Sequence, residues 1–156
     1  MPPDDPIYYP SIKAGNALVS QLKIFFESFD SDTLDMLPEI YTQDVEFIDP
    51  VERIRGILAL KTYFRRQAVG LNYCKFRYLG ELVGQNKAYI SWEMIFSHPK
   101  LAGGKELVLP GMSEIHFTQK IYYQRDSYDL GAMLYEQIPV LGFVVRKLKQ
   151  RLSHIA

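Results

Sequence analysis

The chain has 156 residues, with 18 basic and 18 acidic side chains, and 47% of its residues are hydrophobic. This length and apolar content predict one folded domain with its own core rather than a disordered chain. The balanced charge argues against a general nucleic-acid-binding protein, so we expect no nucleic acid partner.

The single cysteine, Cys74, cannot form a disulfide within the chain and has no metal-ligand spacing around it. No apolar run reaches the length needed to span a membrane, and the first residues lack the pattern of a signal peptide. We therefore expect a soluble cytoplasmic protein in a reducing compartment, with no metal.

The chain begins with a proline-rich segment. Residues 1–10 contain four prolines and predict an irregular arm, so a single domain is expected over residues 11–156. Apolar residues then recur at helical spacing and predict a first helix over residues 11–29. This apolar series comprises Leu18, Leu22, Phe25 or Phe26, and Phe29. A second helix, over about residues 33–41, contains Pro38, which is expected to shorten or kink it.

A short strand follows and ends at a carboxylate. In an extended strand Val45, Phe47 and Asp49 share one face, and Pro50 holds Asp49 in extended geometry. Asp49 is either a strand-end carboxylate that caps nearby amides in water, or an acid that faces a pocket. In the second case it could serve as a general base.

A third helix follows Gly56, and the rest of the chain is mostly strand. Strands are predicted over residues 73–83, 87–97, 105–117 and 120–128, joined by short turns. Such short links predict an antiparallel meander. Pro110 lies inside the third of these strands, so that strand should have an edge or a bulge there.

This element order predicts an α+β fold. The helices would cover the concave face of a curved antiparallel sheet and leave a cone-shaped cavity, and a last helical section should run from about residue 132, interrupted at Pro139. Its part over residues 141–156 is amphipathic and basic. It would either lie over the open end of the cone with a solvated basic face, or make a peripheral membrane contact.

The segment Leu34–Pro50, followed by Gly56–Phe64 and four strands, resembles the nuclear transport factor 2-like superfamily, which includes SnoaL-like cyclases and ketosteroid isomerases. The resemblance implies a dimer of cone-shaped α+β barrels (cystatin-like), each with an internal pocket for a small hydrophobic molecule and no cofactor. It places Asp49 where ketosteroid isomerases carry their general base. The positions of their two oxyanion donors fall on Phe25 and Ser113, which argues against steroid isomerisation.

The segment Arg125–Leu130 is similar to a catalytic segment of limonene epoxide hydrolases and implies a catalytic role for Asp126. Trp92 and Met94 replace the Arg-x-Asp pair that those enzymes need on an earlier strand. Asp126 shares a predicted face with Tyr122, Gln124 and Tyr128, so this face either is solvated or lines the pocket.

The remaining candidates have two interpretations each. Trp92 is either a core residue or part of a cavity wall, and Ser113 is more simply a buried hydroxyl bonded to the backbone than a nucleophile. The leading hypothesis is a ligand-binding protein that acts as a cofactor-free isomerase, cyclase or hydrolase, with Asp49 as base and Asp126 as second acid. Phe25, Phe47, Trp92, Ser113 and Tyr128 would contact the ligand. The alternative is a non-catalytic ligand-binding or dimeric assembly module of the same fold.

Overall fold

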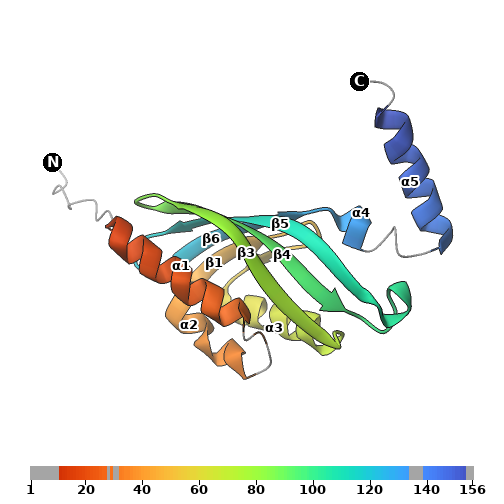
Figure 1. Ribbon diagram of the computed structural model, residues 1–156. Coiled ribbons are helices and arrows are strands. Elements are labelled where there is room, and N and C mark those ends of the chain that lie inside the picture. The colour runs from red at the N-terminus through yellow and green to blue at the C-terminus, as the bar shows by residue number, and fades with distance from the viewer. Residues whose placement is uncertain (1–10, 28, 30–31, 134–138, 154–156) are drawn as a thin grey trace.

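The computed structural model describes residues 11–27, 29, 32–133 and 139–153, so the predicted arm at residues 1–10 lies outside the described residues. The first half of the chain contains α1 (Ile12–Glu27), the 3-10 helix η1 (Thr33–Met36), α2 (Leu37–Ile40), β1 (Tyr41–Ile48), β2 (Arg53–Arg55) and α3 (Ile57–Val69). The second half contains β3 (Tyr73–Val83), β4 (Lys87–Ser97), the 3-10 helix η2 (Ala102–Gly104), β5 (Glu106–Phe117), β6 (Ile121–Tyr128), α4 (Leu130–Met133) and α5 (Pro139–Ser153) (Figure 1).

The six strands form one sheet in the order β2-β1-β6-β5-β4-β3. Strands β3 to β6 form the predicted antiparallel meander, and each lies within one residue of its predicted bounds. β1 pairs in parallel with β6, while β2 pairs with β1 as a short antiparallel edge. The sequence pattern does not predict the parallel pairing or the strand β2. Short hairpin links predict pairing only between strands that are neighbours in sequence.

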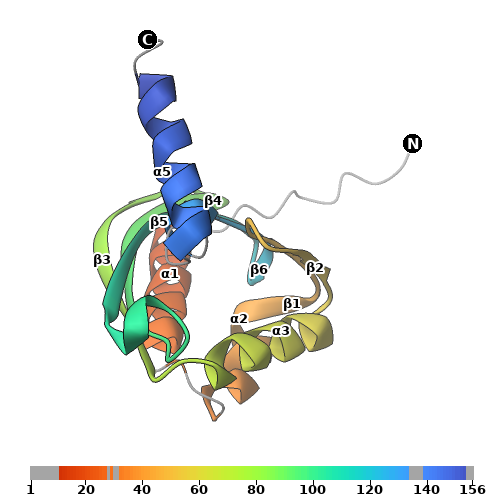
Figure 2. The same ribbon diagram turned by 90° about the vertical axis from the view of Figure 1, so that its right-hand side faces the viewer.

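The helices lie on one face of this curved sheet, as predicted. α1 packs against β3 and β4, and α3 packs against β1 and β2 (Figure 1). Viewed along its long direction, the sheet curls around the helices and leaves an open end (Figure 2). The α+β, cone-shaped fold is therefore confirmed.

The helices owe their positions to a few local features. On α1 the side chains of Leu18, Leu22 and Phe25 are buried at helical spacing. Gly56, which precedes α3, has a φ of 88°, a conformation that suits glycine, and its N–H donates to the Val45 carbonyl at 2.8 Å. This contact turns the chain from β2 directly into α3.

Two prolines mark boundaries in the fold. Pro110 pairs with Glu93 of β4, but β6 pairs with β5 only from Gly111 onward, so Pro110 lies where β5 has a locally free edge. Pro38 lies in the first turn of α2, where its missing N–H leaves no intrahelical bond unmade. The predicted second helix is accordingly split into η1 and α2.

The C-terminal helix differs from the favoured prediction. Pro139 begins α5, which suits the first position of a helix, and α5 stands away from the sheet instead of lying across the open end of the cone (Figure 1). In the described segments, no helix has the length and apolar character required to cross a bilayer.

Candidate functional site

A cavity of about 310 Å³ opens between the concave face of the sheet and α3. Aromatic and aliphatic side chains form most of its wall. These are Phe26, Phe29, Phe47, Phe64, Leu71, Phe76, Trp92, Met94, Phe96 and Leu101. Its polar wall residues include two carboxylates, Asp49 and Asp126. A mostly apolar hollow with a few polar groups is typical of a small-molecule site.

Asp49 follows β1 and is held by four hydrogen-bond donors. Its Oδ1 accepts from the backbone N–H groups of Val51 at 2.8 Å and Glu52 at 2.9 Å. Its Oδ2 accepts from the hydroxyl of Tyr63 and from that of Tyr128 at 3.3 Å. Asp49 therefore caps a turn with one oxygen and faces the cavity with the other, which combines the two alternatives that the sequence left open.

The two tyrosines that contact Asp49 stay protonated. Burial, followed by the hydrogen bond to Asp49, raises the pKa of Tyr63 far above its usual value. Burial and the nearby charge of Asp49 do the same to the pKa of Tyr128. Both phenols therefore act as hydrogen-bond donors throughout the physiological range, and they fix the orientation of the Asp49 carboxylate.

Asp126 lies on β6 at the end of a buried polar chain. Its Oδ1 accepts from the Ser113 hydroxyl at 2.6 Å and from Gln124 Nε2 at 2.9 Å. Behind them, Trp92 Nε1 donates to Ser113 Oγ at 2.9 Å, and the Tyr41 hydroxyl donates to Gln124 Oε1 at 2.6 Å. The network positions Oδ1, whereas Oδ2 accepts no hydrogen bond from the part of the chain that the structure describes.

The environment of Asp126 suits proton transfer near neutral pH. Burial raises the pKa of this carboxyl to about 6, and the negative charge of Asp49 acts in the same direction. The hydrogen bonds from Ser113 and Gln124 oppose the shift because they stabilise the ionised form. A carboxyl group with such a pKa exchanges protons readily at physiological pH.

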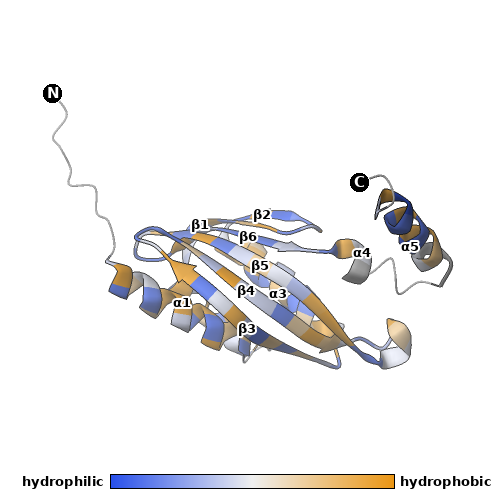
Figure 3. Cartoon of the chain, turned by 45° about the horizontal axis from the view of Figure 1, so that its top comes forward, coloured by the Kyte–Doolittle hydropathy of each residue, from blue (hydrophilic) through white to orange (hydrophobic). Residues whose placement is uncertain are grey.

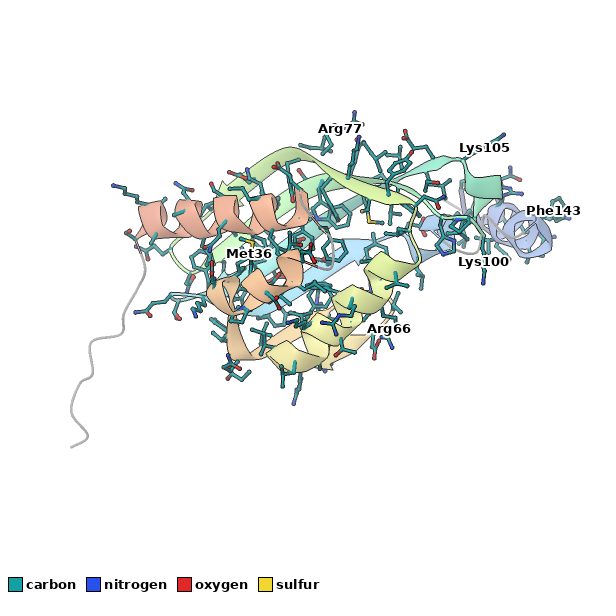
Figure 4. The ribbon with its side chains drawn as sticks, turned by 90° about the horizontal axis from the view of Figure 1, so that it is seen from below. Met36, Arg66, Arg77, Lys100, Lys105 and Phe143 are labelled. Atoms are coloured by element: carbon teal, nitrogen blue, oxygen red, sulfur yellow. The ribbon has the colours of Figure 1, made fainter. Side chains whose placement is uncertain are left out.

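The exposed part of the cavity wall marks its opening. Arg66, Gln67 and Gly70, at the end of α3, line the cavity and are exposed, and we call this region the mouth. Arg66 lies at this end of α3 in Figure 4 and forms an ion pair with Glu52 at 2.7 Å. A ligand would enter here and reach the two carboxylates beyond the aromatic wall.

A sequence model of the SnoaL-like domain family matches residues 22–122, which span most of the cavity-forming elements. The chain belongs to this family. A search of the curated proteins finds no match.

Several solved structures share this fold. A candidate SnoaL-like polyketide cyclase from Jannaschia sp. CCS1 is 13% identical with a TM-score of 0.70, over 85% of this chain and 94% of its own. A candidate polyketide cyclase from Xanthomonas campestris pv. campestris is 14% identical with a TM-score of 0.67, over 78% and 96%. A Catenulispora acidiphila protein with a ketosteroid isomerase-like fold, solved with trimethylamine, is 11% identical with a TM-score of 0.65, over 77% and 90%. At these identities the likeness shows the nuclear transport factor 2-like fold.

Most of the site residues that the sequence predicts come together in one cavity of the SnoaL-like domain. Asp49, Asp126, Phe47, Trp92 and Tyr128 all line it. The other two candidate ligand contacts, Phe25 and Ser113, do not line it. Phe25 is fully buried behind the wall, where its ring packs against Phe26, Phe29 and Phe64. Ser113 is buried as well and bonds to the side chains of Asp126 and Trp92 rather than to the backbone.

Tyr122 does not share the inner face with Asp126. The register of β5 and β6 shifts so that His116 pairs with Tyr123 while Phe117 pairs with Ile121. The resulting bulge leaves Tyr122 unpaired and exposed, with its ring against His116. A one-residue bulge carries no clear signal in an alternating sequence pattern.

The sequence alone does not mark Tyr63 and Gln124 as site residues, although each bonds to a carboxylate of the cavity. Tyr63 lies one position before Phe64 and three after Leu60, so the helical spacing does place it on the buried face of α3. The sequence places Gln124 only in a polar row on β6. The Tyr63 hydrogen bond to Asp49 depends on how α3 packs against β1, and the Gln124 hydrogen bond to Asp126 depends on side-chain conformation within β6, neither of which residue spacing reveals.

Replacing Asp49 tests its double function as a cap and as an acceptor. Asparagine can keep the cap on Val51 and Glu52, so Asp49→Asn should lower the free energy of unfolding by only about 1 kcal/mol. Alanine removes the cap and leaves both tyrosine hydroxyls without this acceptor, so Asp49→Ala should lower it by about 2–3 kcal/mol. Urea denaturation compares the two, and equal losses would show that the cap contributes nothing.

Proposed function

We propose that this SnoaL-like domain is a cofactor-free isomerase or cyclase that binds a small hydrophobic molecule and moves a proton with Asp126. The observation that carries the proposal is the presence of two carboxylates on the wall of one apolar cavity. A water-poor aromatic wall strengthens the interaction of such groups with a bound substrate. The polyketide cyclase names of the solved structures with this fold point to the same class of chemistry.

The geometry favours Asp126 over Asp49 as the base. Both oxygens of Asp49 already accept hydrogen bonds, from two backbone amides and two phenols. Asp126 accepts both of its hydrogen bonds through Oδ1. Its Oδ2 is therefore the better placed atom to take a proton from a carbon next to a substrate carbonyl group. Asp49 would orient the substrate through Tyr63 and Tyr128.

In the reaction we propose, Oδ2 of Asp126 removes a proton from the substrate and an enolate forms. The proton then returns to another atom of the same molecule, which gives an isomer, or the enolate carbon attacks a second carbonyl group and closes a ring. In the second case the proton passes to the new alkoxide, so neither course needs an oxidant or a reductant. A positioned general base typically contributes about 10²–10⁴-fold to such a rate.

The second candidate function is a non-catalytic ligand-binding module. Three donors on the cavity wall are engaged within the protein, since Tyr63 and Tyr128 bond to Asp49 and Trp92 bonds to Ser113. A developing enolate oxygen would then find few donors unless these side chains rearrange. This alternative predicts tight binding without proton exchange.

The test uses Trp92, the single tryptophan of the chain, as a reporter of occupancy. The protein is titrated with hydrophobic cyclic enones of increasing size while tryptophan fluorescence is recorded. Each enone that binds is then incubated with the protein in D₂O, and deuterium uptake next to its carbonyl group is followed by NMR. We expect at least one enone to bind and exchange, with a rate that falls by roughly 100-fold or more in Asp126→Asn at unchanged affinity.

The exposed Asp44 of β1 supplies the matched control, because Asp44→Asn removes a carboxylate away from the cavity and should leave the exchange rate unchanged. Exchange at the full rate in Asp126→Asn would place the base elsewhere. Binding of the enones with no exchange by the unaltered protein would favour the binding module.

A further inference from the structure

We propose that α5 docks the protein onto an anionic lipid bilayer, with the mouth of the cavity at the membrane side. This inference goes beyond the proposed chemistry and stands whether or not the cavity is catalytic. The inference rests on an exposed apolar row on α5 and on a basic row beside it. It also rests on the position of both rows at one end of the molecule.

The apolar row consists of Val144, Leu148 and Leu152, spaced four residues apart along one side of α5. All three are exposed, and Leu148 is 53% accessible. Leucine and valine side chains repeated at this spacing are usually buried against another element. In the described part of the chain nothing covers these three, so the row offers an apolar surface to an external partner.

Other residues of α5 contact the segment around α4. Lys149 pairs with Asp129 at 2.6 Å, and Val145 approaches Gly131, where an added β-carbon would lie 3.7 Å from the valine side chain. These contacts hold α5 beside α4 through side chains that adjoin the apolar row on the helix surface. The three residues of the apolar row nevertheless remain exposed.

The basic side chains match an anionic surface. Lys147 and Arg151 lie four residues apart and run beside the apolar row, and α5 contains no acidic residue. Figure 3 shows strongly hydrophilic and hydrophobic residues side by side on this helix. A helix with an apolar row and basic neighbours binds in the interface of a membrane that contains anionic lipids.

The position of α5 connects this surface with the cavity. In Figure 4, Phe143 of α5 lies beside Lys100 and Lys105 of the η2 region at one end of the molecule, and Arg66 at the mouth lies nearer the middle, on the half toward that end. In Figure 2 the open end of the cone and α5 both face the viewer. Docking through α5 would therefore bring the mouth near the lipid, where a hydrophobic ligand could pass into the cavity without crossing water.

The test is sedimentation of the full chain with large vesicles made of phosphatidylcholine alone or with phosphatidylglycerol mixed in. We expect binding to the anionic vesicles, little binding to the neutral ones, and weaker binding as salt is raised. The double variant Lys147→Gln/Arg151→Gln should bind roughly tenfold more weakly or worse. Leu148→Gln should lose a similar factor, since it removes the centre of the apolar row.

Matched controls remove the same side chains elsewhere. Leu58→Gln on α3, where Leu58 is 78% exposed, and Lys13→Gln on α1 should bind vesicles as the unaltered protein does. No binding to anionic vesicles, or equal losses in Leu58→Gln and Leu148→Gln, would overturn the proposal. A dimer that is broken by Leu148→Gln in the absence of any vesicle binding would also overturn it, because a second copy of the chain would then be the partner.

Discussion

The variant Asp126→Asn is expected to lose catalysed proton exchange and, at the same time, to become more stable at pH 8 by about 3 kcal/mol. Asparagine is nearly the same size, and its Oδ1 can still accept from Ser113 and Gln124. It carries no charge, so the burial penalty of the ionised carboxyl disappears. Loss of function together with a gain in stability is expected where a site holds a charge in an unfavourable place.

The pH dependence identifies the group responsible. The pKa of Asp126 is raised from 3.8 to about 6 in the folded protein, so the folded state binds more protons than the unfolded state between these values. Stability therefore falls as pH rises from about 4 to about 6 and levels off above this range. The stability of Asp126→Asn should not fall over this pH range. Its gain in stability over the unaltered protein should therefore be absent below pH 4 and complete above pH 6.

Urea denaturation of both proteins at several pH values measures this difference, and Asp44→Asn serves as the control because Asp44 is exposed. Exchange activity of the unaltered protein should fall below about pH 6, where Asp126 becomes protonated. A constant difference in stability from pH 4 to pH 8 would contradict the assignment of the raised pKa to Asp126.

Replacing Gly111 by alanine should disturb both the fold and the site. A β-carbon at this position of β5 would lie 2.2 Å from the far edge of the Trp92 ring, which is closer than atoms can approach. The ring must move, and its hydrogen bond to Ser113 would be strained or lost. We expect Gly111→Ala to lower the free energy of unfolding by about 1–3 kcal/mol, as overpacking usually does.

Gly80→Ala is the matched control for this prediction. Gly80 also lies in the sheet, but a β-carbon there would meet its nearest neighbour, the Ser91 hydroxyl, at an ordinary 3.6 Å. Denaturation curves give the stabilities, and Trp92 fluorescence reports whether the ring has moved. Equal stabilities of Gly111→Ala and Gly80→Ala, with an unchanged emission spectrum, would show that Gly111 does not position Trp92.

The sequence predicted the α+β fold well because its signals are local. The apolar spacing that predicts α1 and α3 lies within each helix, and the β-forming residues that predict β3 to β6 lie within each strand. Short turns link these neighbouring strands. The parallel pairing of β1 with β6 and the three-residue strand β2 depend on contacts between distant segments. Such contacts leave no pattern in either segment alone.

The site was predictable in part for the same reason. The row of Val45 and Phe47 places Asp49 toward the cavity, and the alternation on β6 does the same for Asp126. The sequence could not show that a register shift turns Tyr122 outward or that Phe26, rather than Phe25, lines the cavity. Adjacent residues on a helix point in different directions, and apolar periodicity alone does not show which of two adjacent apolar residues faces the cavity.

The parallel pairing of β1 with β6 also has a consequence for how the protein matures. Asp49 follows β1 and Asp126 belongs to β6, which is the last of the six described strands in the chain and lies between β1 and β5. Until β6 occupies this position, the two acids have no fixed separation and the hollow lacks one wall. A partly synthesised chain would therefore possess neither a binding pocket nor a reactive centre, and both would arise together in a single late step.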